Sequence, residues 1–345
     1  MAKIYQQFTG DDTITGQQEI VTATAWSDNS ATLATFFTSS TQSGSSGDYY
    51  LNIYDKDINA DTTALTQFSV AYGHIDGSGS LKTTGGRDGD APTKAIFSQY
   101  KTLLLPEGES SWSSTDSAGT VRSVKEIYAI NFNRARAKEA LDPGNWELTL
   151  SSSIGTRASI TLKDDSADSA GTTGIAGKAY DVISGSIGTA GTDTGNDTRY
   201  GKFYPEQGMI ILDAGLVSQD AMGIVASRGR RSGSNTSDFP MESAKFYNHI
   251  KGGASFKARN AQSLTCTYYF CRVKNQDYNY SNNPTFVTGS NGTLRHSTFR
   301  QNPQTYITTV GMYNNANELL AVAKLSKPLL KNFSREALIK VKLEY

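Results

Sequence analysis

Residues 305–345 read TYITTVGMYNNANELLAVAKLSKPLLKNFSREALIKVKLEY, and this stretch decides the fold class. Residues 305–313 are rich in β-branched and aromatic side chains, an Asn-rich turn follows at 314–317, and 319–325 are apolar again. Two such runs around a short polar turn predict a β-hairpin. Ser326, Lys327 and Pro328 are expected to interrupt its second strand.

A third strand is predicted to close the chain at residues 337–345, where apolar and charged side chains alternate irregularly. Lys324, Lys327 and Lys331 recur along the hairpin without a nearby His or Cys. We interpret them as an exposed face of the sheet rather than as a reaction site.

The composition extends this interpretation to the whole chain. Gly, Ser, Thr, Asn and Tyr are abundant among the 345 residues, with 32 Gly and 18 Tyr. This composition is typical of β-rich, loop-rich proteins. The predicted fold class is mainly β with a few short helices, a β-rich α+β fold, in several domains that end in a C-terminal antiparallel β-sheet domain.

Four segments are predicted from the distribution of strand, turn and helix signals. They are an N-terminal β arm or hairpin region at 1–64, a β-rich domain at 65–150 with helices near 92–105 and 133–141, a loop-rich middle region at 151–253, and a C-terminal β-domain at 254–345. Within the middle region, 163–200 is expected to form surface loops around one central strand, and these loops, like 38–48, are expected to become ordered on assembly.

The expected helices have recognisable ends. Asp90 is the predicted N-cap of the helix at 92–105, with Pro92 in its first turn. A helix at 239–251 is expected to be capped by Gly252, and a short one is expected at 216–225. The apolar run at 203–212 predicts a single strand.

Charge and cysteine content narrow the function classes. Lys plus Arg and Asp plus Glu each number 33, so the formal charge is zero and gives no reason to expect nucleic acid or an anionic membrane as partner. No run approaches the roughly 18 apolar residues of a membrane helix, and the first ten residues do not predict a signal peptide. Cys266 and Cys271 are expected to be buried and reduced, on opposite faces of one strand.

Catalytic chemistry has little support in the sequence. The three histidines are scattered, and the chain has no Cys-x-x-Cys, His-Glu-x-x-His or Gly-x-Ser-x-Gly motif. Adjacent aspartates at 11–12 and 164–165 are interpreted as solvated turn residues rather than as a pair of catalytic carboxylates. We therefore predict no catalytic, cofactor-binding or metal-binding residue, and no enzyme activity.

Several phrases carry a resemblance to a known group of proteins. These are AYGHIDGSGS, PTKAIFSQYKTLLLPEGE, INFNRARAKEALDPGNWEL and, most specific, NPTFVTGSNGTLRH and the C-terminal stretch quoted above. Together they make most of residues 65–345 resemble virion structural proteins of contractile-tailed cyanophages and other marine phages of the T-even-like group.

The resemblance implies a multi-copy structural part of the tail, at the baseplate or its wedges, with the neck or collar as the competing position. The implied partners are other virion proteins and copies of the chain itself, with assembly in the host cytoplasm and no cofactor. A receptor- or glycan-binding module at the virion surface, with a host glycan as ligand, is the alternative from another class. A polysaccharide-degrading tail enzyme is a third.

Seven residues are predicted as interface contacts. Arg134 and Arg136 belong to a short basic helix, and Arg230 and Arg231 to a basic turn. The remaining three are tyrosines in polar loops or at a strand end, whose rings suit either a protein interface or a sugar face: Tyr278, Tyr280 and Tyr313.

Overall fold

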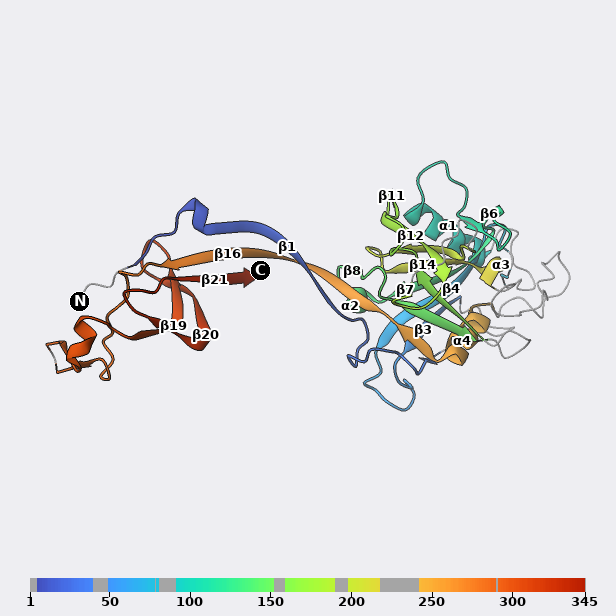
Figure 1. Ribbon diagram of the computed structural model, residues 1–345. Helices are drawn as coiled ribbons and strands as arrows, with labels where there is room; N and C mark the ends of the chain where they lie inside the picture. The colour runs from blue at the N-terminus through green and yellow to red at the C-terminus, as the bar shows by residue number, and fades with distance from the viewer. Residues whose placement is uncertain are drawn as a thin grey trace. The chain divides into compact units, whose positions relative to one another are not determined.

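The computed structural model describes residues 5–39, 49–77, 79–80, 91–151, 159–189, 198–217, 242–289 and 291–344 (Figure 1). Within these ranges the chain is mostly strand with four α-helices, so the predicted β-rich fold class is confirmed. The contacts divide the chain into two compact units. Unit 1 comprises residues 1–20 and 263–345, and unit 2 comprises residues 21–262.

These units do not coincide with the four predicted segments. The first twenty residues belong with the C-terminal ones, because strand β1 (Thr13–Thr24) joins the sheet of β16 (Arg259–Val273) and β21 (Ala337–Glu344). Pairing between strands so distant in sequence leaves no local signal, so the sequence could not reveal it. Of the two structures expected before Trp26, an arm or a hairpin, the chain forms the arm, because Thr13–Thr24 is the single strand β1.

Unit 2 is built on an 11-stranded sheet, in which all described pairings are antiparallel. Its strands follow the order β15-β9-β10-β12-β13-β14-β7-β4-β3-β2, with β11 paired to β12. Their bounds are β2 (Phe37–Thr38), β3 (Tyr50–Tyr54), β4 (Thr66–His74), β7 (Glu126–Phe132), β9 (Glu147–Ser151), β10 (Ser159–Asp164), β11 (Thr172–Gly174), β12 (Gly177–Ser184), β13 (Gly201–Tyr204), β14 (Met209–Asp213) and β15 (Ser255–Lys257).

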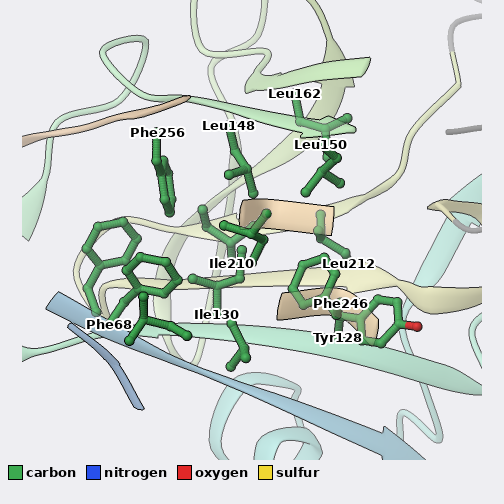
Figure 2. Close-up of a cluster of buried hydrophobic side chains, with 14 of the residues drawn as sticks. Phe68, Tyr128, Ile130, Leu148, Leu150, Leu162, Ile210, Leu212, Phe246 and Phe256 are labelled. Atoms are coloured by element: carbon green, nitrogen blue, oxygen red, sulfur yellow. The ribbon is translucent and has the colours of Figure 1, made fainter. Parts of the chain in front are cut away.

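Both faces of this sheet are covered, because successive side chains of its central strands enter two different clusters. In β7, Tyr128 and Ile130 join one core and Ile127 and Ala129 join the other. Figure 2 shows the first core, where the ring of Phe246 from α4 (Glu242–Gly253) stacks on Tyr128 with centroids 4.3 Å apart. These strands therefore read as nearly continuous apolar runs rather than as alternating ones.

The second core lies under α1 (Pro92–Leu104), which contacts β4. A close approach is possible because β4 carries Gly73, where an added Cβ would lie 2.9 Å from the backbone N of Phe97. The predicted helix start is corrected: the N-cap is Ala91, with no capping side chain, rather than Asp90.

Other predicted elements also need correction. The helix expected at 133–141 ends early: α2 covers Arg134–Ala137 and is followed by β8 (Ala140–Leu141), because Lys138 has φ +52° and breaks the helical path. α4 continues through the expected cap Gly252 and is followed by Ala254 at φ +48°.

Two predictions missed strands. The run at 203–212 is a hairpin of β13 and β14, because residues 205–208 form its turn. The central strand expected within 163–200 is present as β12, but the flanking segment expected to be loop also holds the end of β10 and the strand β11. α3 covers Ala214–Leu216, and residues 218–225, the rest of the helix expected there, lie outside the described residues.

Unit 1 pairs β19 (Thr305–Tyr313) with β20 (Leu319–Lys331), beside the β1-β16-β21 sheet. The predicted hairpin is thus present, and its pairing is interrupted where Ser326, Lys327 and Pro328 were expected to interrupt it, although β20 itself continues through them. The ladder passes from the Thr309–Lys324 pair directly to the Ile307–Leu329 pair, so Pro328 sits in a bulge where its missing N–H breaks no ladder bond.

Short elements complete the two units. They are the 3-10 turns η1 (Gly10–Asp12) and η3 (Ser297–Arg300), and the two-stranded pairs β5 (Ser113–Thr115) with β6 (Val121–Ser123) and β17 (Val287–Thr288) with β18 (Thr293–Leu294).

Candidate interaction surface

The core of unit 1 lies between the β19–β20 hairpin and the β16–β21 part of the sheet. Among the described residues of unit 1, this cluster has Met312, Ile339 and Val341 as its buried members, with half-buried apolar residues packed around them. These side chains come from one face of the β19–β20 hairpin and from the facing side of the β16–β21 sheet. The two outer faces of unit 1 are chemically different, and this difference defines the candidate surface.

The outer face of the β1-β16-β21 sheet is charged and internally paired. The Lys342 ammonium contacts Glu19 and lies 2.6 Å from a Glu344 carboxylate oxygen, and the Tyr268 hydroxyl donates to Glu19. The Lys340 ammonium lies 3.7 Å from the centroid of the Tyr268 ring. The hydrogen bonds to Glu19, of which the one from Lys342 has the largest effect, lower the pKa of the Glu19 carboxyl. The negative charge on this face is thus stabilised by the chain's own groups.

Glu19, Cys266 and Glu344 also place three possible ligand atoms within 4.8 Å of one another. The Lys342 ammonium already bonds both carboxylates, and these hydrogen bonds to Glu19 and Glu344 raise the pKa of Lys342. The cation between the two carboxylates is therefore the ammonium group of Lys342. We interpret the group as an ion-pair cluster. Cys266 is buried and Cys271 half-buried, and both are free thiols.

The outer face of the hairpin is apolar. The "hairpin patch" consists of Tyr313 on β19, Leu319, Leu320 and Val322 on β20, and Tyr5. Leu320 and Val322 are 69% and 59% exposed, although the residue between them, Ala321, packs inward. No ion pair of the described residues crosses this patch, in contrast to the opposite sheet.

Two backbone features build the patch. The β19–β20 register skips one residue between the Met312–Ala321 and Tyr313–Leu319 pairs, and this bulge leaves both Leu319 and Leu320 exposed. Gly311 leaves little space beside it: an added Cβ would lie 3.0 Å from the Tyr313 ring and 3.3 Å from the Leu319 Cδ1. Tyr313 and Leu319 therefore lie against the bare backbone of β19.

Tyr5 completes the patch from the N-terminal residues of unit 1. Its ring meets the Tyr313 ring edge-on, with centroids 4.9 Å apart. Such an aromatic pair is worth about 1 kcal/mol beyond its buried area. Both rings stay partly exposed, so the pair widens the apolar surface instead of closing it.

The other predicted tyrosines pack within their own loop. Tyr280 meets the Phe286 ring edge-on at 5.6 Å, and Phe286 stacks on Phe299 at 4.8 Å. Tyr278 adopts φ +54°, and its carbonyl accepts a hydrogen bond from Thr305. Both tyrosines remain exposed by more than 40%, but the structure assigns them to the loop after β16 and not to the hairpin patch.

This loop is fixed by a buried lysine that the sequence interpretation placed on an exposed face. Lys331 is fully buried, and its ammonium donates to the Asn275 carbonyl at 2.7 Å, the Asn279 side chain at 2.9 Å and the Asn332 carbonyl at 2.9 Å. Its three N–H donors thus have three acceptors. Burial lowers the pKa of Lys331, while Asp277 and Glu336 oppose that shift.

The predicted arginines belong to unit 2. The Arg134 guanidinium donates to three carbonyls, those of Lys138, Glu139 and Glu206, and thereby ties α2 to the β13–β14 turn. Arg136 is half-buried, and its carbonyl accepts from Asn260. Arg230 and Arg231 lie outside the described residues.

The interior polar groups of unit 2 are structural. The Ser114 hydroxyl donates to Asp213 at 2.6 Å, and burial, opposed by this bond, raises the pKa of Asp213. Ser114 is 2% exposed, so no substrate reaches its oxygen. Tyr72 and Tyr128 donate to Glu126 and Glu242 in the same way.

One of the two aspartate pairs differs from its predicted role, whereas Asp11 and Asp12 lie in the turn η1, as predicted, with no buried residue. Asp164 and Asp165 are 1% and 6% exposed, so the interpretation as solvated turn residues is wrong for this pair. Asp164 accepts from the backbone N–H groups of Gly144 and Ser166, and Asp165 from that of Asp181. They are buried because they satisfy backbone donors.

No protein-family model, no curated protein and no solved structure matches this chain. None of the helices in the described part of the chain has the length and apolar character needed to span a membrane. Of the five residues of the hairpin patch, the sequence analysis predicted only Tyr313, and the structure identifies the other four. Its sequence signal was the run Leu319-Leu320-Ala321-Val322, in which outward positions are apolar.

Proposed function

We propose that this protein is a structural component of a phage virion, a tail or baseplate assembly protein that makes multi-copy protein–protein contacts. The observation that carries the proposal is the hairpin patch: an apolar outer face on a unit whose opposite face is covered by ion pairs. Contiguous apolar patches rimmed by polar groups are typical of protein interaction sites. The phage assignment itself rests on the sequence resemblance.

The contact is expected to rest on apolar anchors. Tyrosine and other large aromatic side chains are among the residues that dominate binding energy, so Tyr5 and Tyr313 are the expected anchors, whereas exposed ion pairs contribute little. The proposed partners are other virion proteins and copies of this chain, without a cofactor, nucleic acid or membrane. A neck or collar position is the alternative place within the same class.

A virion-surface glycan-binding module is the second candidate, favoured by the exposed Tyr278 and Tyr280 rings. The polar groups beside them are largely engaged, because the Asn275 carbonyl and the Asn279 side chain bind Lys331. A sugar-binding site needs free polar groups next to its aromatic platform, so this candidate ranks second.

The test is electron cryomicroscopy of the particle encoded by the same genome, assembled with the native chain, with Val322→Lys and with Leu338→Lys. Leu338 is 62% exposed on β21, outside the patch, and serves as the control. We expect tail or baseplate density for the native and control chains and its loss for Val322→Lys. Particles without density for the native chain would overturn the proposal, and glycan-array binding abolished by Tyr280→Ala would favour the second candidate.

A further inference from the structure

Lys331 and Asn279 bring an amine and a carboxamide together in unit 1. Lys331 is the last residue of β20 and is fully buried, and its Nζ lies 2.9 Å from Oδ1 of Asn279 in the loop after β16. The amide carbon is one C=O bond away from that oxygen, so the amine nitrogen lies within about 4 Å of the carbon. An amine and a carboxamide held this close can form an isopeptide bond, because proximity replaces a bimolecular encounter.

The Asn279 amide is held in one orientation. Its Nδ2 donates to the Asn275 carbonyl at 2.6 Å, so exchanging the side-chain nitrogen and oxygen would bring two carbonyl oxygens together. The backbone beside it is also fixed, because Tyr278 has φ +54° and its carbonyl accepts from the Thr305 hydroxyl at 2.9 Å. The side-chain carbonyl of Asn279 is therefore kept toward Lys331.

The surroundings of Lys331 favour the neutral amine that the reaction requires. Burial lowers the pKa of Lys331, and the charges of Asp277 and Glu336 oppose that shift, so both carboxylates act on its ammonium. A lysine desolvated in this way is an activated nucleophile. Asp277 is half-buried and lies two residues before Asn279 in the same loop, whereas Glu336 is exposed and faces the Asn275 backbone N–H at 3.5 Å. Asp277 is thus the better placed proton carrier.

From this arrangement we infer that unit 1 forms an intramolecular isopeptide bond between Lys331 and Asn279, with Asp277 as the proton carrier. The lysine nitrogen attacks Cγ of Asn279, a C–N bond forms there, and the bond from Cγ to Nδ2 breaks. Two protons pass in turn from the lysine nitrogen to the leaving nitrogen through the Asp277 carboxylate. The products are a secondary amide and an ammonium ion, so no oxidant or other reactant is consumed.

The bond joins the loop after β16 to the end of β20, two residues that are 52 positions apart in the chain. A covalent link across such a span restricts the unfolded chain, as a disulfide does. Small cores are commonly supplemented by links of this kind, and the described core of unit 1 is small. The inference is independent of the proposed function, because it concerns chemistry inside unit 1 and not its partners.

The experiment is mass spectrometry of the folded full chain. We expect an intact mass about 17 Da below the mass of the sequence, the loss of one ammonia. Trypsin cleaves after Lys and Arg but not before Pro, so it should release a branched peptide that joins residues 275–295 to residues 325–335, uncleaved at Lys331. A native chain at the full sequence mass would overturn the inference, and so would the same loss without the branched peptide, as in a succinimide at an asparagine.

Variants of the reacting groups give the second measurement. Asn279→Ala and Lys331→Arg each remove one reacting group and are expected to keep their full sequence masses. Asn275→Ala is the matched control, because Asn275 takes part through its backbone carbonyl, and it is expected to form the bond as the native chain does. Circular dichroism checks that each variant is folded. An ammonia loss that persists in folded Asn279→Ala would refute the assignment.

The role of Asp277 is tested separately. Asp277→Ala is expected to slow formation of the bond about 100-fold, so that freshly purified protein is largely uncross-linked. Asp277→Glu keeps a carboxylate and should restore most of the reaction, and Glu336→Ala should leave it unchanged. Equal cross-linking of Asp277→Ala and the native chain, or a loss caused by Glu336→Ala instead, would overturn the assignment of the proton carrier.

Discussion

The dipeptide Asp-Asp occurs in an exposed turn at residues 11–12 and in a buried position at residues 164–165. Asp11 is exposed in η1, where its neighbour Asp12 forms a capping box with Thr9. Asp164 lies at the end of β10 and is buried, with its carboxylate 2.9–3.0 Å from the Gly144 backbone N. The sequence around both pairs is polar, so burial could not be inferred from it.

We expect Asp164→Ala to lower the free energy of unfolding by about 2–4 kcal/mol, because it leaves the half-buried backbone N–H groups of Gly144 and Ser166 without their acceptor. Asp11→Ala is the matched control and is expected to change stability by less than about 0.5 kcal/mol. Urea unfolding of both variants measures the difference. Equal effects of the two substitutions would refute the structural role of Asp164.

Lys331 gives a second prediction at this scale. Lys331→Met keeps the volume but leaves the three oxygens that bind the ammonium unpaired, and we expect a loss of about 3 kcal/mol in unit 1. Lys327→Met, an exposed lysine on the same strand, is the control. Thermal unfolding checks this, and a Lys331→Met protein as stable as the control would show that the ammonium contacts contribute nothing.

At the scale of elements, α4 carries a pH-sensitive contact. His249 lies 2.7 Å from the Ser151 carbonyl at the end of β9, and burial lowers its pKa, opposed by this hydrogen bond. Above about pH 6.5, the ordinary pKa of histidine, both the folded and the unfolded protein hold it neutral. Below that pH the unfolded chain takes up the proton first, so stability is lost as the pH falls toward the folded-state pKa.

His249→Gln should therefore lose less stability than the native chain between pH 7.5 and 5.5, since glutamine can donate to Ser151 without titrating. The slope attributable to His249 is at most about 1.4 kcal/mol per pH unit. His296→Gln, which removes an exposed histidine, is the control and should follow the native chain. Parallel pH profiles for the native chain and His249→Gln would exclude the proposed coupling.

The elements were predictable where their signals are local. Pro92 and the spacing of Ile96, Tyr100 and Leu104 placed α1 within a residue of its observed end. The β13–β14 hairpin was missed because both strands are apolar and their turn at 205–208 was read as part of one run. β20 continues past Pro328 because residues 325–328 bulge out of the ladder between the Thr309–Lys324 and Ile307–Leu329 pairs, which the sequence of β20 does not reveal.

The candidate surface was less predictable than the fold. Tyr313 was identified from its aromatic character, but the contributions of Leu319 and Leu320 depend on a one-residue register shift. Arg134 looked like a surface charge and instead binds three backbone carbonyls. The register shift and the acceptors of Arg134 are details of backbone geometry that residue type and spacing do not reveal.

For the whole molecule, the two units differ in how much core they contain. Both large clusters of unit 2 draw only on residues between 21 and 262, whereas the core of unit 1 has few well-buried side chains. A chain of residues 21–262 is thus expected to fold alone, because its buried apolar area is self-contained.

Calorimetry of the full chain should then show two transitions, the lower from unit 1, and the fragment should retain the upper one within a few degrees. Lys331→Met should lower only the first transition. A single transition in the full chain together with an unfolded fragment would contradict this independence.

The assignment of β1 to unit 1 has a consequence for synthesis on the ribosome. The strand emerges among the first residues, but β16 and β21, with which it forms a sheet, emerge only after the whole of unit 2. Unit 2 can fold during translation, while β1 has to wait without its neighbours until the last eighty residues are made. The hairpin patch is consequently displayed only after β20 has been made, so a nascent chain that stops within unit 2 does not carry this surface.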